Sequence, residues 1–104
     1  MRYAVEIDLD YGASPEAEVR TVWQMVRAAM LAAGFRADWR RFVVNEEPAV
    51  AARTAHGVIE EVERRLGRQG RSVYQYVRGF YGYPVACAEN LLVAPVEGIE
   101  VRAL

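Results

Sequence analysis

Residues 3–10 have side chains that alternate between two faces, one apolar and one mainly acidic, the pattern of a β-strand with only one buried face. Four apolar residues share one face: Tyr3, Val5, Ile7 and Leu9. The other face carries one small residue and three acids: Ala4, Glu6, Asp8 and Asp10. A carboxylate that is buried without a partner costs several kcal/mol. We therefore expect the acidic face to be solvated, paired or bound to a metal.

Two amphipathic helices are predicted after this strand. The first begins with Ser14 as N-cap and Pro15 at the first helical position, and it ends at Gly34. Its apolar stripe consists of Val19, Val22, Trp23, Val26, Met30 and Ala33. The second helix begins at Pro48, and its stripe consists of Ala51, Ala55, Val58, Ile59, Val62 and Leu66. Each helix thus has one side for packing against a sheet.

Residues 39–44 between the helices are predicted to form the second strand. A right-handed crossover through the first helix would place it beside the first strand. Phe42 then faces the helices and Arg41 lies on the opposite face, where it is expected to pair with Glu6 or Asp8.

The alternation of residues 73–78 predicts a third strand, and Gly79, Gly82 and Pro84 are expected to bend the chain after it. Two short terminal strands are predicted at residues 90–94 and 98–102, on either side of Pro95. The elements predict a single α+β domain over residues 1–104. Its architecture is a two-layer sandwich, with two helices on one face of a mainly antiparallel sheet of four or five strands. The nearest common architecture is the ferredoxin-like plait.

This order of elements is similar to that of the small CRISPR-associated nucleases with the ferredoxin-like plait. The first strand of those proteins ends in an acid, as this strand does at Asp8 or Asp10. They place two strands between their helices, where the pattern here predicts one. The resemblance covers the order of elements and this acid, so no activity is carried over from it.

The amino-acid composition excludes several kinds of chemistry. The chain has 104 residues, 13 basic and 14 acidic, for a net charge of -1, which argues against a general nucleic-acid binder. All basic residues are arginine, so Schiff-base chemistry and a phosphate-loop lysine are excluded. His56 and Cys87 are the only residues of their types, which excludes a histidine-rich metal site and an intrachain disulfide within one chain. No apolar run reaches the length of a spanning helix, so we expect no membrane anchor and a cytoplasmic location.

Three groups of residues are candidates for a site, and no cofactor is identified. The candidates for an interface or a ligand site are Glu6, Asp8, Trp39, Arg41, Tyr74, Tyr76 and Tyr81. The candidates for binding a phosphate are Arg64, Arg68 and Arg71. Asp8 and Asp10 lie two apart on a strand, close enough for both carboxylates to bind one hard cation.

The leading hypothesis is a small homo-oligomer, a dimer as first guess. It would use its uncovered sheet face and the tyrosine-rich segment 74–83 for self-association or to bind a small polar ligand. The alternative is a metal-dependent phosphodiester hydrolase that uses Asp8 and Asp10. A second alternative is a single-stranded RNA-binding module that stacks bases on Tyr74, Tyr76 and Trp39, although the nearby carboxylates would repel phosphates.

Overall fold

The computed structural model describes residues 2–12 and 14–87. In chain order the elements are β1 (Arg2–Leu9), α1 (Glu16–Ala32), β2 (Arg36–Asp38), β3 (Arg41–Asn45), α2 (Pro48–Gly67), the 3-10 helix η1 (Val73–Gln75), β4 (Val77–Pro84) and the 3-10 helix η2 (Val85–Cys87). The terminal strands predicted at 90–94 and 98–102 lie outside the described residues. None of the helices in this part of the chain is both long and apolar enough to cross a membrane.

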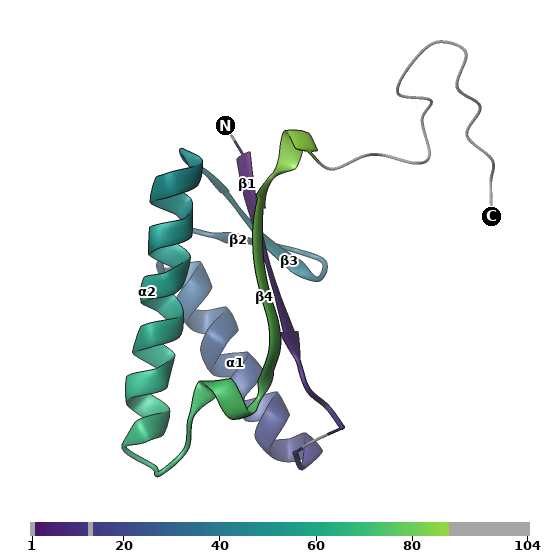
Figure 1. Cartoon of the computed structure of the whole chain (residues 1–104), viewed down its shortest axis with the longest axis vertical. Coiled ribbons are helices and arrows are strands. Elements are labelled where there is room, and N and C mark those ends of the chain that lie inside the picture. The colour runs from purple at the N-terminus through teal and green to yellow at the C-terminus, as the bar shows by residue number, and fades with distance from the viewer. Residues whose placement is uncertain (1, 13, 88–104) are drawn as a thin grey trace, which may run out of the picture.

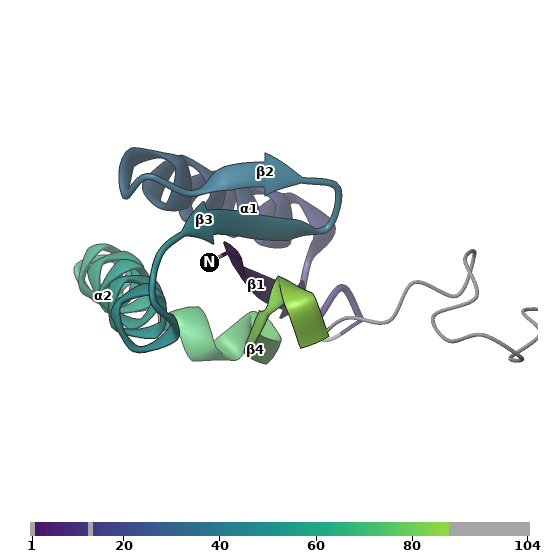
Figure 2. The same cartoon turned by 90° about the horizontal axis from the view of Figure 1, so that it is seen from above.

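The four strands form one antiparallel sheet in the order β2-β3-β1-β4. Figure 1 shows α1 and α2 together on one side of β1 and β4. Figure 2 shows the β2–β3 hairpin crossing β1 at an angle, as the twist of a sheet requires. The predicted two-layer α+β sandwich is confirmed, and its strand order is that of a ferredoxin-like plait.

The core lies between the helices and the predicted apolar face of β1. Tyr3, Val5, Ile7 and Leu9 are all buried there. The helices contribute the buried residues Val19, Val22, Val26 and Met30 from α1, and Ala51, Ala55, Val58, Ile59, Val62 and Leu66 from α2. Full burial of each large aliphatic side chain contributes about 1.5–3 kcal/mol, so these stripes fix which side of each helix meets the sheet.

The region between the helices differs from its prediction, because it contains two strands. β2 and β3 form a hairpin whose last pair, Asp38 and Arg41, is joined by the two-residue turn Trp39–Arg40. β3 does lie beside β1, but the extra reversal at this turn makes the two antiparallel. The sequence contains no Asn-Gly or Asp-Gly pair here, so the usual signal for a hairpin is missing.

The prediction of a strand at 73–78 is also wrong, because residues 73–75 form η1. Ser72 caps this 3-10 helix: its hydroxyl accepts from the Tyr74 N–H, and the Gln75 side chain accepts from the Ser72 N–H. Glu63 on α2 accepts from the Ser72 hydroxyl at 2.9 Å and from the Val73 N–H at 2.7 Å. These bonds satisfy backbone groups that a strand would have used in a sheet.

The predicted bend at 79–84 is a strand instead, and it lies at the edge of the sheet formed by the described residues. β4 pairs with β1 from Leu9–Val77 to Tyr3–Pro84, with one bulge between Asp8 and Leu9. Each glycine of β4 lies beneath an aromatic ring: a Cβ on Gly79 would lie 2.6 Å from Cε2 of Tyr81, and one on Gly82 would lie 2.8 Å from Cε1 of Tyr3. Pro84 ends the strand, where its missing N–H costs nothing.

Both helix starts use proline, with one difference from the prediction. The N-cap of α1 is Pro15, not Ser14, and the Pro15 carbonyl accepts from the N–H groups of Glu18 and Val19. In α2, Pro48 is the first helical residue, as predicted. Gly34 follows α1 with a φ of 102°, a conformation that glycine adopts easily.

Candidate functional site

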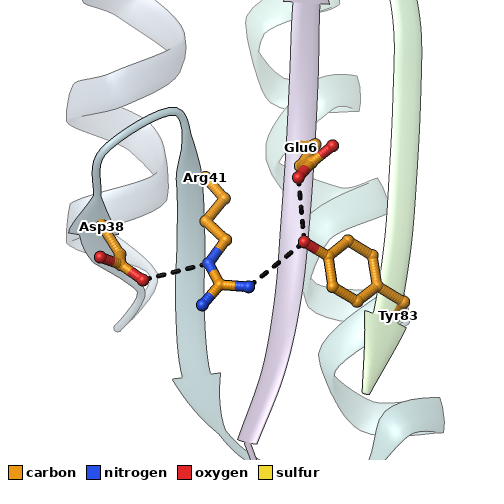
Figure 3. A network of polar contacts seen from close by, with 4 residues as sticks. All are labelled: Glu6, Asp38, Arg41 and Tyr83. Atoms are coloured by element: carbon orange, nitrogen blue, oxygen red, sulfur yellow. Dashed lines mark hydrogen bonds and ion pairs between the residues drawn. The ribbon is translucent and has the colours of Figure 1, made fainter. Parts of the chain in front are cut away.

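The face of the sheet that the helices leave uncovered, called the open face below, carries a network with one side chain from each strand (Figure 3). Arg41 on β3 donates from Nε to Oδ2 of Asp38 on β2 at 3.0 Å. It also donates from Nη1 to the Tyr83 hydroxyl on β4 at 3.3 Å. That hydroxyl in turn donates to Oε1 of Glu6 on β1 at 2.9 Å. Tyr83 therefore links two residues of opposite charge.

The network modifies the predicted contact between Arg41 and Glu6. Their backbones are directly opposite in the sheet, as the prediction requires, but the guanidinium reaches the Glu6 carboxylate through Tyr83. The hydrogen bonds to Tyr83 and then to Asp38 raise the pKa of Arg41. Arg41 therefore stays charged over the physiological pH range.

The charges on the open face are divided between its two ends. Arg2 and Arg36 lie at one end, since Arg2 is in phase with Ala4 on β1 and Arg36 is directly opposite Val43. Glu6 and Asp8 lie at the other end of β1. Arg2, Arg36 and Asp8 are exposed, and Glu6 is partly buried. The end with Arg2 and Arg36 is thus basic. The other end carries the acids Glu6, Asp8 and Asp38 together with Arg41, for a net charge of −2 (1 − 3).

An open groove of about 600 Å³ lies where β1 ends. We call it the β1-end groove, and it is lined by Ile7, Asp8, Leu9, Tyr11, Trp23, Trp39, Arg40 and Arg78. This volume falls within the range of small-molecule sites, roughly 300–1,000 Å³. The lining combines an acid and two arginines with three aromatic rings.

Two irregularities of the sheet produce the groove. β3 pairs with β1 only as far as the Glu6–Arg41 pair, so Ile7, Asp8 and Leu9 pair with β4 alone. On the other flank, Arg78 is the extra residue of the bulge, between Val77 opposite Leu9 and Gly79 opposite Asp8. The groove is therefore bordered by the hairpin turn on one side of β1 and by the bulge on the other.

The charged residues of the groove are not neutralised by one another. Asp8, Arg40 and Arg78 are exposed, and within residues 2–12 and 14–87 none of them forms a salt bridge. With two arginines and one aspartate, their net charge is +1 (2 − 1). The groove thus offers charged groups of both signs to a ligand.

Trp39 stands at the lip of the groove and is 98% exposed. Its φ is 56°, and no other non-glycine residue in the described part of the chain has a positive φ. A positive φ at the first central residue alone is typical of a type II′ turn, in which glycine is preferred at that position. Trp39 therefore combines a fully exposed ring with an unfavourable backbone conformation.

The remaining interface candidates separate in space. Tyr76 is buried in the core, where its hydroxyl donates to Oε2 of Glu18 at 3.2 Å. Tyr74 is exposed on η1, so neither residue lies on the open face. Tyr81 does lie on the open face, 57% exposed, with its ring over Gly79 and next to Asp8. The predicted stacking face of Tyr74, Tyr76 and Trp39 is therefore not assembled.

The arginines at the end of α2 are partly neutralised. Arg64 donates from Nε to Oε2 of Glu61 at 3.1 Å, and Arg65 lies 3.5 Å from the other oxygen of the same carboxylate. The hydrogen bond from Arg64 lowers the pKa of Glu61. Arg71 donates to the Gln69 side chain at 3.0 Å. A phosphate site at Arg64, Arg68 and Arg71 stays a prediction.

The two acids predicted to share a metal occupy different settings. Asp8 lines the groove, whereas the Asp10 carboxylate accepts from the Gly12 N–H at 3.1 Å in the turn after β1. No group of three or more histidine, cysteine or acidic side chains gathers in the part of the chain that the structure describes. Metal binding by Asp8 and Asp10 also stays a prediction.

Sequence reasoning did not select Asp38 and Tyr83 of the open-face network, or Tyr11, Arg40 and Arg78 of the groove. The alternation of β1 indicates that its acids face away from the core, but not which residues of β4 lie opposite them. The bulge at Arg78 shifts that pairing and has no sequence signal of its own.

The comparisons with protein-family models, with curated proteins and with solved structures found no significant match.

Proposed function

We propose that the protein functions as a homodimer whose two sheets meet through their open faces. The observation that supports this most directly is the division of charge, with Arg2 and Arg36 at one end and Glu6 and Asp8 at the other. A two-fold interface brings the same patch of both subunits together, so the patch must complement itself.

The charge arrangement meets that requirement for one orientation of the axis. If the two-fold axis lies in the plane of the interface and is perpendicular to the strands, the β1 strands of the two subunits run in opposite directions. The basic end of one subunit then meets the acidic end of the other, and the same pairing occurs twice. Tyr81, 57% exposed and directly opposite Glu6 at the acidic end, adds an aromatic surface of the kind enriched in interfaces.

Charge reversal tests this orientation. The first variant, Arg2→Glu/Arg36→Glu, makes both ends acidic, and the second, Glu6→Gln/Asp8→Arg, makes both ends basic. The amide oxygen introduced by Glu6→Gln would still accept from the Tyr83 hydroxyl, so the network can persist. Sedimentation velocity at micromolar concentration should give a dimer for the unmodified protein, a monomer for each variant alone and a dimer for their equimolar mixture.

The matched control is Arg27→Glu/Arg53→Glu, which changes two exposed helical arginines and should remain dimeric. A monomeric unmodified protein, or a mixture that does not associate, refutes the proposed interface.

A second candidate is metal-assisted hydrolysis of a phosphodiester at Asp8. It is favoured by one observation, the presence of Arg40 and Arg78 in the same groove as that carboxylate. Mg²⁺ is commonly held by one or two carboxylates together with substrate phosphates. The arginines would bind the phosphate and the metal would polarise it.

Calorimetric titration with Mg²⁺ or Mn²⁺, in the presence of a non-cleavable phosphorothioate dinucleotide, tests this candidate. Heat that disappears in Asp8→Asn supports it, and Asp10→Asn serves as the comparison. Absence of heat in the unmodified protein, together with absence of cleavage of the normal dinucleotide, rejects it.

A further inference from the structure

The geometry points to the β1-end groove as a binding site for a nucleoside monophosphate, a planar ring that carries a phosphate. This site adjoins the proposed interface and shares Asp8 with it, but the groove begins beyond the Glu6–Arg41 row, the last of the sheet in which β3 pairs with β1. It requires no metal.

The aromatic residues identify the planar part of the ligand. Trp39 and Tyr11 are 98% and 62% exposed and line the same groove, with Trp23 partly buried behind them. Large exposed aromatic side chains are favourable surfaces for stacking, and every nucleobase has a π-face to offer. Exposing two such rings to water beside one groove is not favourable in itself, so their position indicates a ligand that stacks on them.

The arginines identify the charged part. Arg40 comes from the hairpin turn and Arg78 from the bulge, so positive charge borders the groove from both flanks of β1. Neither has a salt-bridge partner among the described residues. An unpaired guanidinium binds phosphate oxygens through a fork of N–H donors.

Asp8 sets the orientation. Its carboxylate repels a phosphate, so the phosphate would lie near Arg40 or Arg78 and the base near Asp8. A carboxylate accepts hydrogen bonds from an amino group on the edge of a base, as adenine provides. AMP therefore has each feature that the groove residues could bind: a large planar ring, an amino group on the edge of that ring and a phosphate.

Binding is measured by titrating AMP in excess EDTA, monitored by calorimetry and by tryptophan fluorescence. The Arg2→Glu/Arg36→Glu variant retains all the groove residues, so the same titration on it separates this inference from the dimer. Adenosine lacks the phosphate and ribose 5-phosphate lacks the ring. We expect each to bind at least about tenfold more weakly than AMP.

Two variants assign the contacts. Trp39→Gly should reduce AMP affinity at least about fivefold and leave ribose 5-phosphate unaffected. Arg78→Gln should reduce AMP affinity and leave adenosine unaffected. Arg27→Gln, on the exposed side of α1, is the matched control and should bind AMP normally.

A short oligoadenylate distinguishes a free nucleotide from the end of a chain as the source of this chemistry. If it binds more tightly than AMP and loses affinity in Trp39→Gly, the groove takes a nucleotide from a strand. If AMP binds no better than inorganic phosphate, or if neither variant weakens it, the inference is wrong.

Discussion

Trp39 combines two unfavourable features. Its φ of 56° places a bulky L-residue in the left-handed region, at a cost of roughly 1–2 kcal/mol. Its side chain is 98% exposed, so burial within the subunit does not offset that cost. Residues with strained backbone conformations cluster at active sites and ligand-binding sites. Trp39 thus lowers the stability of the folded chain and places an aromatic ring at the lip of the groove.

Replacing Trp39 should therefore stabilise the fold when the new residue is glycine. We expect Trp39→Gly to raise the free energy of unfolding by about 1 kcal/mol, or the melting temperature by about 4–8 °C. Trp39→Ala removes the same ring but keeps a Cβ at positive φ, so it should stay close to the unmodified protein. Thermal and urea unfolding measure both. Equal stability of the two variants would show that this turn is not strained.

Tyr83 is the second residue whose role can be isolated. Its hydroxyl accepts from Arg41 and donates to Glu6, and net contributions of hydrogen bonds to charged groups are about 1.5–3 kcal/mol. Because the site is only partly buried, we expect Tyr83→Phe to destabilise the protein by about 1 kcal/mol in urea unfolding. Tyr81→Phe, on the same face but outside this network, should change stability by less than about 0.5 kcal/mol. Similar losses for both would remove the special role of Tyr83.

At the scale of elements, β4 contains two glycines, and an aromatic ring packs over each of them on opposite faces of the sheet. The ring of Tyr3, buried among the core residues, occupies the space above Gly82. The ring of Tyr81, exposed on the open face, occupies the space above Gly79. β4 can thus contain two glycines and still form a strand, since aromatic rings occupy the space that side chains at these positions would fill.

The two glycines predict different costs. In Gly82→Ala the new methyl group meets a ring that the core holds in place, so we expect a loss of about 1–3 kcal/mol. In Gly79→Ala the Tyr81 ring can turn into solvent, and the loss should be smaller. Equilibrium unfolding of both variants gives the comparison. A larger loss for Gly79→Ala would contradict the assignment of the faces.

Elements with long, strong periodicity were predictable, and short ones were not. The alternation of β1 and the stripes of α1 and α2 were enough to identify those three elements and the layer between them. β2 has three residues and η1 has three, too few for a period to be recognised. The Ser72–Gln75 capping box was a usable signal for η1, whereas Trp39–Arg40 carries none for a hairpin turn.

At the scale of the whole molecule, the groove could not be derived from the sequence because it joins four segments that are distant along the chain. Asp8 was selected from the alternation of β1, and Trp39 was selected as part of a longer strand. Arg78 reaches the same groove only through the register of β4 and its bulge. Local patterns indicate which face a side chain takes, while neighbours across a sheet depend on register.

The proposed dimer makes one further prediction, because its association depends on charge. Raising the ionic strength from about 0.01 M to about 1 M shortens the Debye length from about 30 Å to about 3 Å. Exposed ion pairs contribute about 0.2–1 kcal/mol each, and two-fold symmetry repeats every pair. The dissociation constant should therefore rise about tenfold or more over this range, as measured by sedimentation with circular dichroism to confirm folding. Salt should instead strengthen a dimer held by apolar contacts alone, so a lower dissociation constant at high salt would separate the two modes.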